Sequence, residues 1–137
     1  MSTIAVKPLV LKDVLLTIAV DNYEKHVSGV QWVPTSQQIN WQGLTPDAVF
    51  SDVSSPTWAL TLNYVQDWET ANSLSQYLFD HVGETVEMVF TPVKGTGKKT
   101  FTANVTIVPG AIGGEVNAYA TTSVTLGSDK PVIGTTA

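Results

Sequence analysis

The chain has 137 residues, of which 12 are acidic and 7 basic, so its formal net charge at pH 7 is −5. All seven basic residues are lysines, and the chain contains no arginine and no cysteine. Disulfides and cysteine-ligated metals are therefore excluded, and attractive binding to nucleic acid is disfavoured, because arginine is the usual ligand of phosphate and guanine.

A chain of this length is expected to form one domain, residues 1–137, that buries its own core. Charged residues make up 14% of the chain, against roughly 25% in an average globular domain. Thr, Ser, Asn and Gln replace the missing charges and cost less to desolvate than ions, so the surface suits burial against neighbours. We expect neither a signal peptide nor a membrane-spanning segment at the N-terminus.

Alternating apolar residues predict two strands near the N-terminus, over residues 9–20 and 24–33, separated by a turn signal at 21–22. Pro34 is expected to end the second strand, and residues 37–41 to form a short third strand.

The next segment, 42–56, is long and contains glycine and prolines, so a loop is predicted there. It nevertheless carries the apolar residues Leu44, Val49 and Phe50. Loops of this length usually have a function or are ordered by a partner. We therefore expect deletion of this loop to leave a folded domain.

A single helix is predicted over residues 70–82, in a chain that otherwise has the pattern of strands. Its apolar residues recur at the spacing of one helix face. Thr70 or Asn72 can cap its start, and Gly83 provides the left-handed stop after its end. The predicted buried face consists of Leu74, Tyr77, Leu78, His81 and Val82.

Strands flank this helix on both sides, and both have the period of two that half-buried strands show. Their inward residues are Trp58, Leu60, Leu62 and Tyr64 before the helix, and Val86, Met88 and Phe90 after it. A lone helix buries its apolar face against a sheet, so the fold class is mainly β, a sandwich-like or barrel-like domain with one flanking α-helix.

The C-terminal part continues the strand pattern. A Gly-rich hairpin turn is predicted at 94–99, a strand at 101–107, a turn at 109–114 and a last strand at 116–124. Residues 127–137 are expected to form a loose C-terminal arm.

No group of residues meets the requirements of a catalytic, cofactor or metal site. Residues 95–100 are rich in Gly and Lys but lack the spacing of a phosphate-binding loop. Ser73 and Ser75 would point away from His81. His81 is better interpreted as a cation at the helix C-terminus or as a packing residue. His26 stands alone in a strand. We therefore predict that the protein is not an enzyme.

Three stretches of the chain resemble the major tail tube protein of long-tailed, non-contractile bacteriophages, and the resemblance extends roughly from Leu11 onward. They are WALTLNYVQDWETANSLSQY (58–77), FTANVTIVPGAIGGEV (101–116) and AYATTSVTLGSDKP (118–131).

The resemblance implies a β-sandwich with one flanking helix that self-assembles into stacked hexameric rings. The rings form a hollow tube, the conduit for DNA ejection, in which DNA is not specifically bound. The implied partners are other copies of the chain, a tape-measure protein, and tail tip or terminator proteins. Such a protein needs no cofactor, has no catalytic residues, belongs to the virion and is assembled in the cytoplasm of the bacterial host.

The family has a long loop that reaches a neighbouring subunit or ring, and it corresponds by position to 34–56 here. The candidate contact residues are Trp41, Leu44, Val49 and Phe50. A tube that DNA must traverse should also have a negative inner wall, because each wall lysine that neutralised a phosphate would hold the DNA in place. Candidates for that wall are Glu24, Asp67, Glu69, Glu87 and Glu115.

Two alternatives remain open on the sequence. In the first, the protein is a β-sandwich carbohydrate-binding module that stacks sugars on Trp41 and Trp68, whereas Trp58 alternates with core residues and is expected to be buried. In the second, it is a related tube protein of a contractile or secretion device, which would share the fold and the hexamer.

Overall fold

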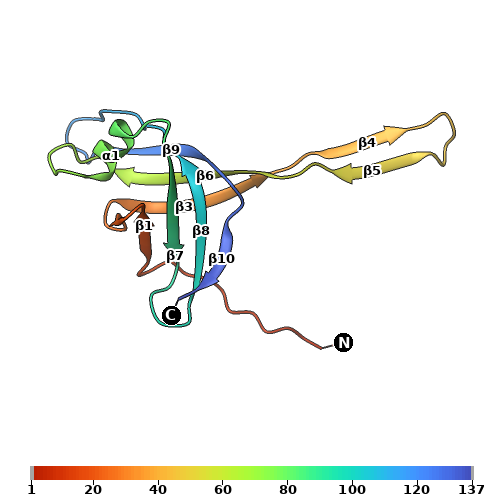
Figure 1. The fold of residues 1–137 in the computed structure, drawn as a ribbon, viewed down its shortest axis with the longest axis horizontal. Coiled ribbons are helices and arrows are strands. Elements are labelled where there is room, and N and C mark those ends of the chain that lie inside the picture. The colour runs from red at the N-terminus through yellow and green to blue at the C-terminus, as the bar shows by residue number, and fades with distance from the viewer. Residues whose placement is uncertain (1, 137) are drawn as a thin grey trace.

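The computed structural model describes residues 2–136, which form ten strands and one α-helix (Figure 1). In chain order these are β1 Leu15–Ile18, β2 Asp21–Asn22, β3 Val27–Thr35, β4 Gln38–Gln42, β5 Val49–Val53, β6 Thr57–Val65, α1 Leu74–Asp80, β7 Thr85–Thr91, β8 Lys99–Thr106, β9 Thr121–Ser128 and β10 Val132–Thr135. Within this part of the chain, the helix is too short and too polar to cross a membrane.

Two crossing layers of strands enclose the core. The strand order is β2-β1-β7-β8-β9-β6-β3, with β10 paired to β8. The ladder between β8 and β9 consists of the pair Val105 and Ser128, and there the sheet turns, so that β7, β8 and β10 run across β3, β6 and β9 (Figure 1). The predicted fold class, a mainly β sandwich-like or barrel-like domain with one flanking helix, is confirmed.

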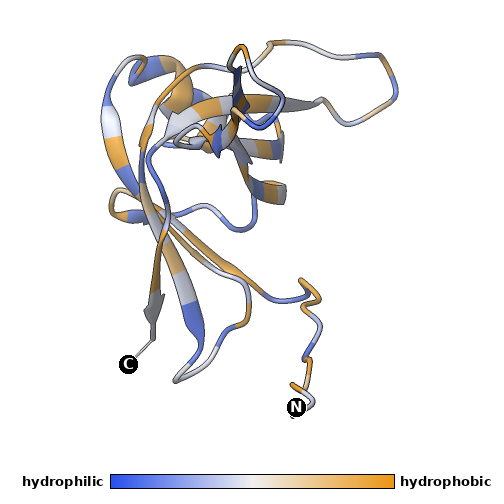
Figure 2. Ribbon diagram, turned by 90° about the vertical axis from the view of Figure 1, so that its right-hand side faces the viewer, coloured by the Kyte–Doolittle hydropathy of each residue, from blue (hydrophilic) through white to orange (hydrophobic). Residues whose placement is uncertain are grey.

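The core confirms the period of two in the strands around the helix. Leu60, Leu62 and Tyr64 of β6 are buried, as are Met88 and Phe90 of β7. Hydrophobic and hydrophilic residues alternate along the strands accordingly (Figure 2). Trp58, expected to be buried, is half-buried because it lies where β6 leaves the layered body. The rest of the buried cluster comes mainly from β1, β8, β9 and α1.

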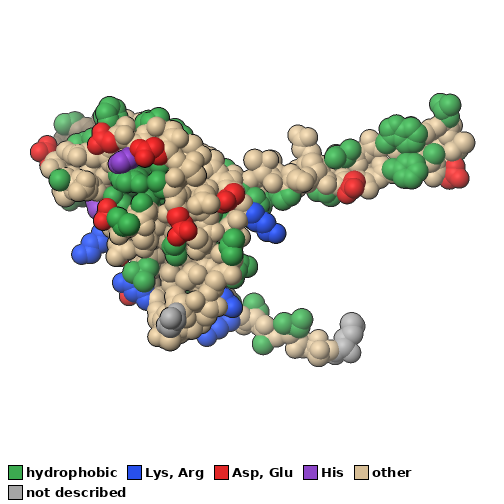
Figure 3. All heavy atoms as spheres, in the orientation of Figure 1, with side chains coloured by type: hydrophobic (Ala, Val, Ile, Leu, Met, Phe, Trp, Pro, Cys, Tyr) green, Lys and Arg blue, Asp and Glu red, His purple; other side chains and the backbone are tan. Residues whose placement is uncertain are grey.

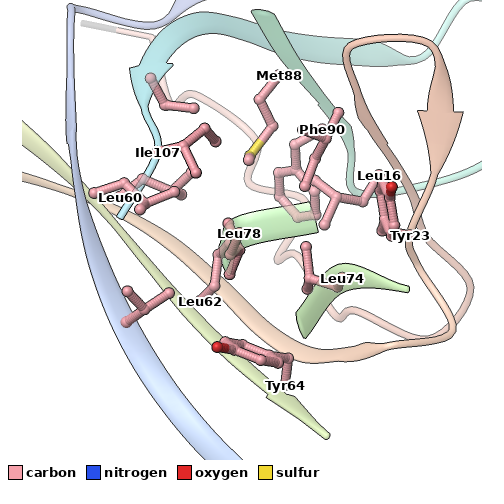
Figure 4. Close-up of a cluster of buried hydrophobic side chains, with 14 residues drawn as sticks. Leu16, Tyr23, Leu60, Leu62, Tyr64, Leu74, Leu78, Met88, Phe90 and Ile107 are labelled. Carbon is pink, nitrogen blue, oxygen red and sulfur yellow. The ribbon is translucent and has the colours of Figure 1, made fainter. Parts of the chain in front are cut away.

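Helix α1 covers one end of the layers and is shorter than the predicted 70–82. Leu74 and Leu78 are fully buried and point into the cluster (Figure 4). Ser73, rather than Thr70 or Asn72, occupies the N-cap position, because its backbone is still extended (φ −64°, ψ 162°) and the helix begins only at Leu74. The predicted stop at Gly83 is confirmed by its φ of 85°.

The buried face of α1 differs from the predicted one at its C-terminal end. Val82 is exposed, and the His81 side chain is 41% exposed. The helix ends at Asp80, before either residue could continue the apolar face. Tyr77 is half-buried and packs against the core, as predicted.

Ser75 was expected to point away from the core, and it is instead buried, with 3% of its surface exposed. Its Oγ accepts a hydrogen bond of 3.3 Å from the backbone N–H of Asp67. We expect Ser75→Ala to lower the free energy of unfolding by about 0.5–1.5 kcal/mol, because the half-buried N–H of Asp67 loses its acceptor. Urea denaturation measures this loss, and a change below about 0.5 kcal/mol, the level of a surface substitution, would contradict it.

The N-terminal strands are shorter than predicted. The strand expected over 9–20 begins at Leu15, and Val10 and Val20 are exposed. A left-handed backbone at Ala19 (φ 57°) ends it. Pro34 does not end β3 but pairs with Trp58 inside it. Proline is tolerated there because β3 is an edge strand. Among the described residues, its outer side has no neighbouring strand that would accept the N–H that proline lacks.

The C-terminal strands are displaced from their predicted positions, although the hairpin turn at 94–99 and the strand after it are confirmed. The strand expected over 116–124 is β9, which begins at Thr121. The preceding residues form a long connection, anchored by hydrogen bonds between the Gln66 side chain and the backbone of Gly113. The predicted loose arm, 127–137, contains the end of β9 and all of β10, which pairs with β8; Ala137 itself lies outside the described residues.

Candidate interaction surfaces

Residues 37–54 form a two-stranded hairpin that projects far from the layered body (Figure 1). We call it the β4–β5 hairpin. It replaces the loop predicted over 42–56, because β4 and β5 pair along their whole lengths. At its base, Ser54 donates from its N–H to the Gln37 carbonyl at 2.8 Å, and its Oγ accepts from the Gln37 N–H at 2.8 Å.

The two faces of the β4–β5 hairpin differ: one carries the aromatic pair together with Asp52, and the other is mainly polar. Trp41 lies directly opposite Phe50, and their rings are 5.8 Å apart between centroids. Ile39 continues this face. The opposite face carries Asn40 and Ser51, whose side chains hydrogen-bond at 2.7 Å. Sequence reasoning missed Ile39, although its alternation with Trp41 was a usable signal.

The four predicted contact residues all lie on this hairpin. Trp41 and Phe50 are 61% and 63% exposed, and Leu44 at the tip is fully exposed. Val49 is also exposed but is on the polar face, beside Gln42. Figure 3 shows the hydrophobic side chains gathered near the end of the projecting segment. Exposed aromatic clusters of this kind mark sites of protein association.

A second surface is the outer face of β3, β6 and β9, which carries no charged side chain. We call it the uncharged sheet face. Leu60, Leu62, Val124 and Leu126 point inward, so the residues between them point outward. The outward side chains are Gln31, Val33, Thr35, Thr57, Ala59, Thr61, Asn63, Thr121, Ser123 and Thr125. The alternation was visible in the sequence, but only the strand order shows that the three strands share one face.

Four of the five predicted acidic wall residues lie in loops at the end of β6 that adjoins α1. Asp67 and Glu69 follow β6, and the connection that contains Glu115 is hydrogen-bonded to Gln66. The turn that contains Glu24 is attached to the same end, because the Val65 N–H donates to the His26 carbonyl at 2.9 Å. Glu87 is apart from them, on the outward face of β7.

Asp67 has a structural task in addition to its charge. Its carboxylate accepts hydrogen bonds from the N–H groups of Glu69 and Thr70, both at 3.1 Å. The Asp67 carboxylate accepts hydrogen bonds from Thr70, and these hold the pKa of Asp67 below its usual range. The larger effect comes from the Thr70 side chain and the smaller from its N–H. The group is therefore ionised at neutral pH, and it fixes the turn that leads into α1.

The residues considered for nucleophilic chemistry do not form a site. Ser73 and Ser75 are buried and bonded to the Asp67 backbone, whereas His81 lies at the other end of α1. His81 stacks on Tyr77 and its Nδ1 is 2.6 Å from a Glu84 carboxylate oxygen. Within residues 2–136, no three His, Asp or Glu side chains are placed to hold a metal ion.

The two tryptophans of the sugar-binding alternative are far apart in the fold. Trp41 is on the β4–β5 hairpin, and Trp68 lies beside α1, where its ring meets Phe79 edge-on at 6.1 Å between centroids. The Trp68 Nε1–H donates to Gln66 at 3.3 Å. The two rings therefore cannot form one stacking platform within a single chain.

No family model matches the sequence, and no curated protein matches it. Solved structures do match the fold. A chain from the cryo-EM structure of an extracellular contractile injection system, the PVC sheath/tube terminator in the extended state, aligns with a TM-score of 0.68 and 12% identity, covering 96% of this chain and 99% of that one. A chain from the PVC sheath-tube complex in the extended state aligns with a TM-score of 0.64 and 12% identity, covering 93% and 92%. The protein shares the fold of these chains over almost its whole length.

Proposed function

We propose that the protein is a structural, non-enzymatic tube protein whose copies assemble into stacked hexameric rings with a central channel. The observation that carries the proposal is the exposed aromatic face of the β4–β5 hairpin, on a fold shared with chains of a sheath-tube assembly. Trp41 and Phe50 bury against each other only in part, so a single chain leaves a costly apolar surface in water. Association of copies removes that cost.

The tube is the conduit for DNA ejection in the tail of a non-contractile bacteriophage, the assignment that the sequence resemblance supports. The protein is then a virion component assembled in the host cytoplasm. Its other partners are a tape-measure protein and tail tip or terminator proteins. The second candidate, a tube component of a contractile injection device, is favoured by the names of the structures that share the fold.

We place the uncharged sheet face toward the channel. It has no lysine that could hold a passing phosphate, and its hydroxyl and amide groups keep it wetted. Asp67, Glu69 and Glu115 border the end of this face and give the channel wall its negative potential. Glu24 does not join them, because it lines the groove that contains Leu16 and Phe90, and one of its carboxylate oxygens is buried. Glu87 contributes only if the β7 layer also faces the channel.

Replacing wall carboxylates by lysine should slow ejection without preventing assembly. In Glu69→Lys/Glu115→Lys, two exposed side chains gain a positive charge that binds phosphate and releases counterions. Glu69→Gln/Glu115→Gln is the matched control, which removes the negative charges without adding positive ones. DNA release from assembled particles is the measurement. Ejection at the normal rate in the lysine variant would contradict the channel assignment of these residues.

Sedimentation velocity and negative-stain electron microscopy of the purified protein test the proposed function. We expect rings or tubes at high protein concentration without any added cofactor. A monomer across a wide range of protein and salt concentrations would contradict self-assembly.

A further inference from the structure

A groove lies between the N-terminal segment, residues 7–12, and the turn that connects β7 to β8. Its volume is about 590 Å³, and its apolar lining comes from Leu9, Val10, Val93 and Phe101. Leu9 and Val10 remain mostly exposed although they are close to these other apolar side chains. The groove therefore offers an apolar floor that nothing in the described chain covers.

Lysines surround this floor, and we call the site the basic groove. Lys7, Lys12, Lys98 and Lys99 line it, and no carboxylate does. Among residues 2–136, none of these four lysines is within ion-pair distance of an acidic side chain. The net acidic protein thus concentrates four of its seven lysines at one apolar groove.

The β4–β5 hairpin has the complementary chemistry. Its exposed face presents Trp41 and Phe50, and its two charged residues are Asp47 at the tip and Asp52 beside the aromatic pair. Asp52 lies opposite Ile39, so it shares the face that carries the aromatic rings. An apolar face with carboxylates at its border fits an apolar floor with lysines at its border.

The two surfaces of one chain do not meet in the structure. The β4–β5 hairpin extends from the body at the level of β3 and β6, whereas the N-terminal segment runs toward the same side of the view but well below the hairpin, from the lower end of the β7 layer (Figure 1). The occupant of the groove must therefore come from another molecule.

We propose that the β4–β5 hairpin of one copy docks in the basic groove of a second copy, with Trp41 and Phe50 on the apolar floor and Asp47 and Asp52 facing the lysines. This inference rests on the proposed self-assembly and names the surface that receives the hairpin. The contact is heterologous, because each copy gives a hairpin and receives a different one. Such contacts continue from copy to copy until they close a ring or extend a stack, and they do not stop at a dimer.

Charge reversal tests the pairing between copies with samples that each contain a single variant. Asp47→Lys/Asp52→Lys and Lys12→Glu/Lys99→Glu should each raise the concentration needed for assembly by at least about tenfold, because like charges then face each other. The chain that carries all four substitutions should assemble again. Lys25→Glu/Lys130→Glu is the matched control, since it makes the same change in net charge outside the groove, and it should assemble normally.

Mixing two defective variants tests the direction of the contact. Replacing residues 36–56 by Asn-Gly leaves a chain with a groove and no hairpin, and Lys12→Glu/Lys99→Glu/Val93→Asp leaves a hairpin and no groove. Each should remain monomeric alone, and an equal mixture should form heterodimers, measured by light scattering after gel filtration. Monomers in the mixture would overturn the proposal.

The same variants separate failure of this inference from failure of the proposed function. If wild-type protein forms tubes and the groove variants form them equally well, the hairpin docks elsewhere and only the groove assignment is lost. If groove variants assemble normally but lose binding to duplex DNA that the wild-type protein shows, the groove is a phosphate site, and the proposal is wrong.

Discussion

Replacement of residues 36–56 by Asn-Gly should give a folded, soluble monomer that forms neither rings nor tubes. Thr35 and Thr57 are paired in the β3–β6 ladder, so a two-residue turn can join them without a change of register. The removed segment contributes no side chain to the buried cluster. The thermal midpoint should therefore change little, while assembly, followed by sedimentation velocity, is lost.

A smaller change on the same hairpin separates its chemistry from its length. Trp41→Ser/Phe50→Ser should also abolish assembly, because the two rings are the anchors of the exposed face. Asn40→Ala/Ser51→Ala is the matched control on the opposite face, where both partners of one hydrogen bond are removed together, and it should assemble normally. If the shortened chain unfolds, the segment is part of the folded core and the expected result is wrong. If the aromatic variant assembles, the hairpin is not the assembly element.

Leu78→Ala should lower the free energy of unfolding by about 2–5 kcal/mol. Leu78 is fully buried on α1, between the two layers of strands, and the truncation leaves a cavity that the surrounding β-strands cannot close (Figure 4). α1 has seven residues and is held by packing, so its own hydrogen bonds cannot offset the loss.

Asp80→Ala is the control for Leu78→Ala. Asp80 is exposed in the last turn of α1, where a negative charge is unfavourable to the helix dipole. Its replacement should be neutral or slightly stabilising. Urea denaturation of both variants measures the difference, and equal losses would mean that α1 does not cover the core through Leu78.

The parts of the fold that sequence predicts best are those where one residue pattern decides the structure. In β6 and β7, large apolar residues recur at every second position, mostly with polar or smaller residues between them, so the period of two is clear. The centre of α1 is equally clear, because Leu74 and Leu78 occupy one face at helical spacing.

Sequence-based prediction fails where contacts with distant strands or side chains decide the structure. Residues 127–137 have no strong pattern, and β10 exists because it completes an edge of β8. Val116 alternates with its neighbours as a strand residue would, yet it lies in a connection that side-chain hydrogen bonds from Gln66 hold in place. The period of a short apolar run cannot report such distant contacts.

For the candidate surfaces too, the sequence indicates individual residues but not how the fold brings them together. The exposed Trp41 and Phe50 were predicted as contact residues from their place in a long segment, but their pairing on one face requires the β4–β5 register. The basic groove joins residues 7–12 to residues 92–101, which are at least 80 positions away in the sequence, so no local pattern could indicate it.

A cryo-EM map of the assembled wild-type protein tests the central claim most directly. The account predicts rings of six copies stacked around an open channel, with the uncharged sheet face toward the channel and each β4–β5 hairpin against a neighbouring copy. An assembly without a channel, or a channel lined mainly by lysines, would contradict it.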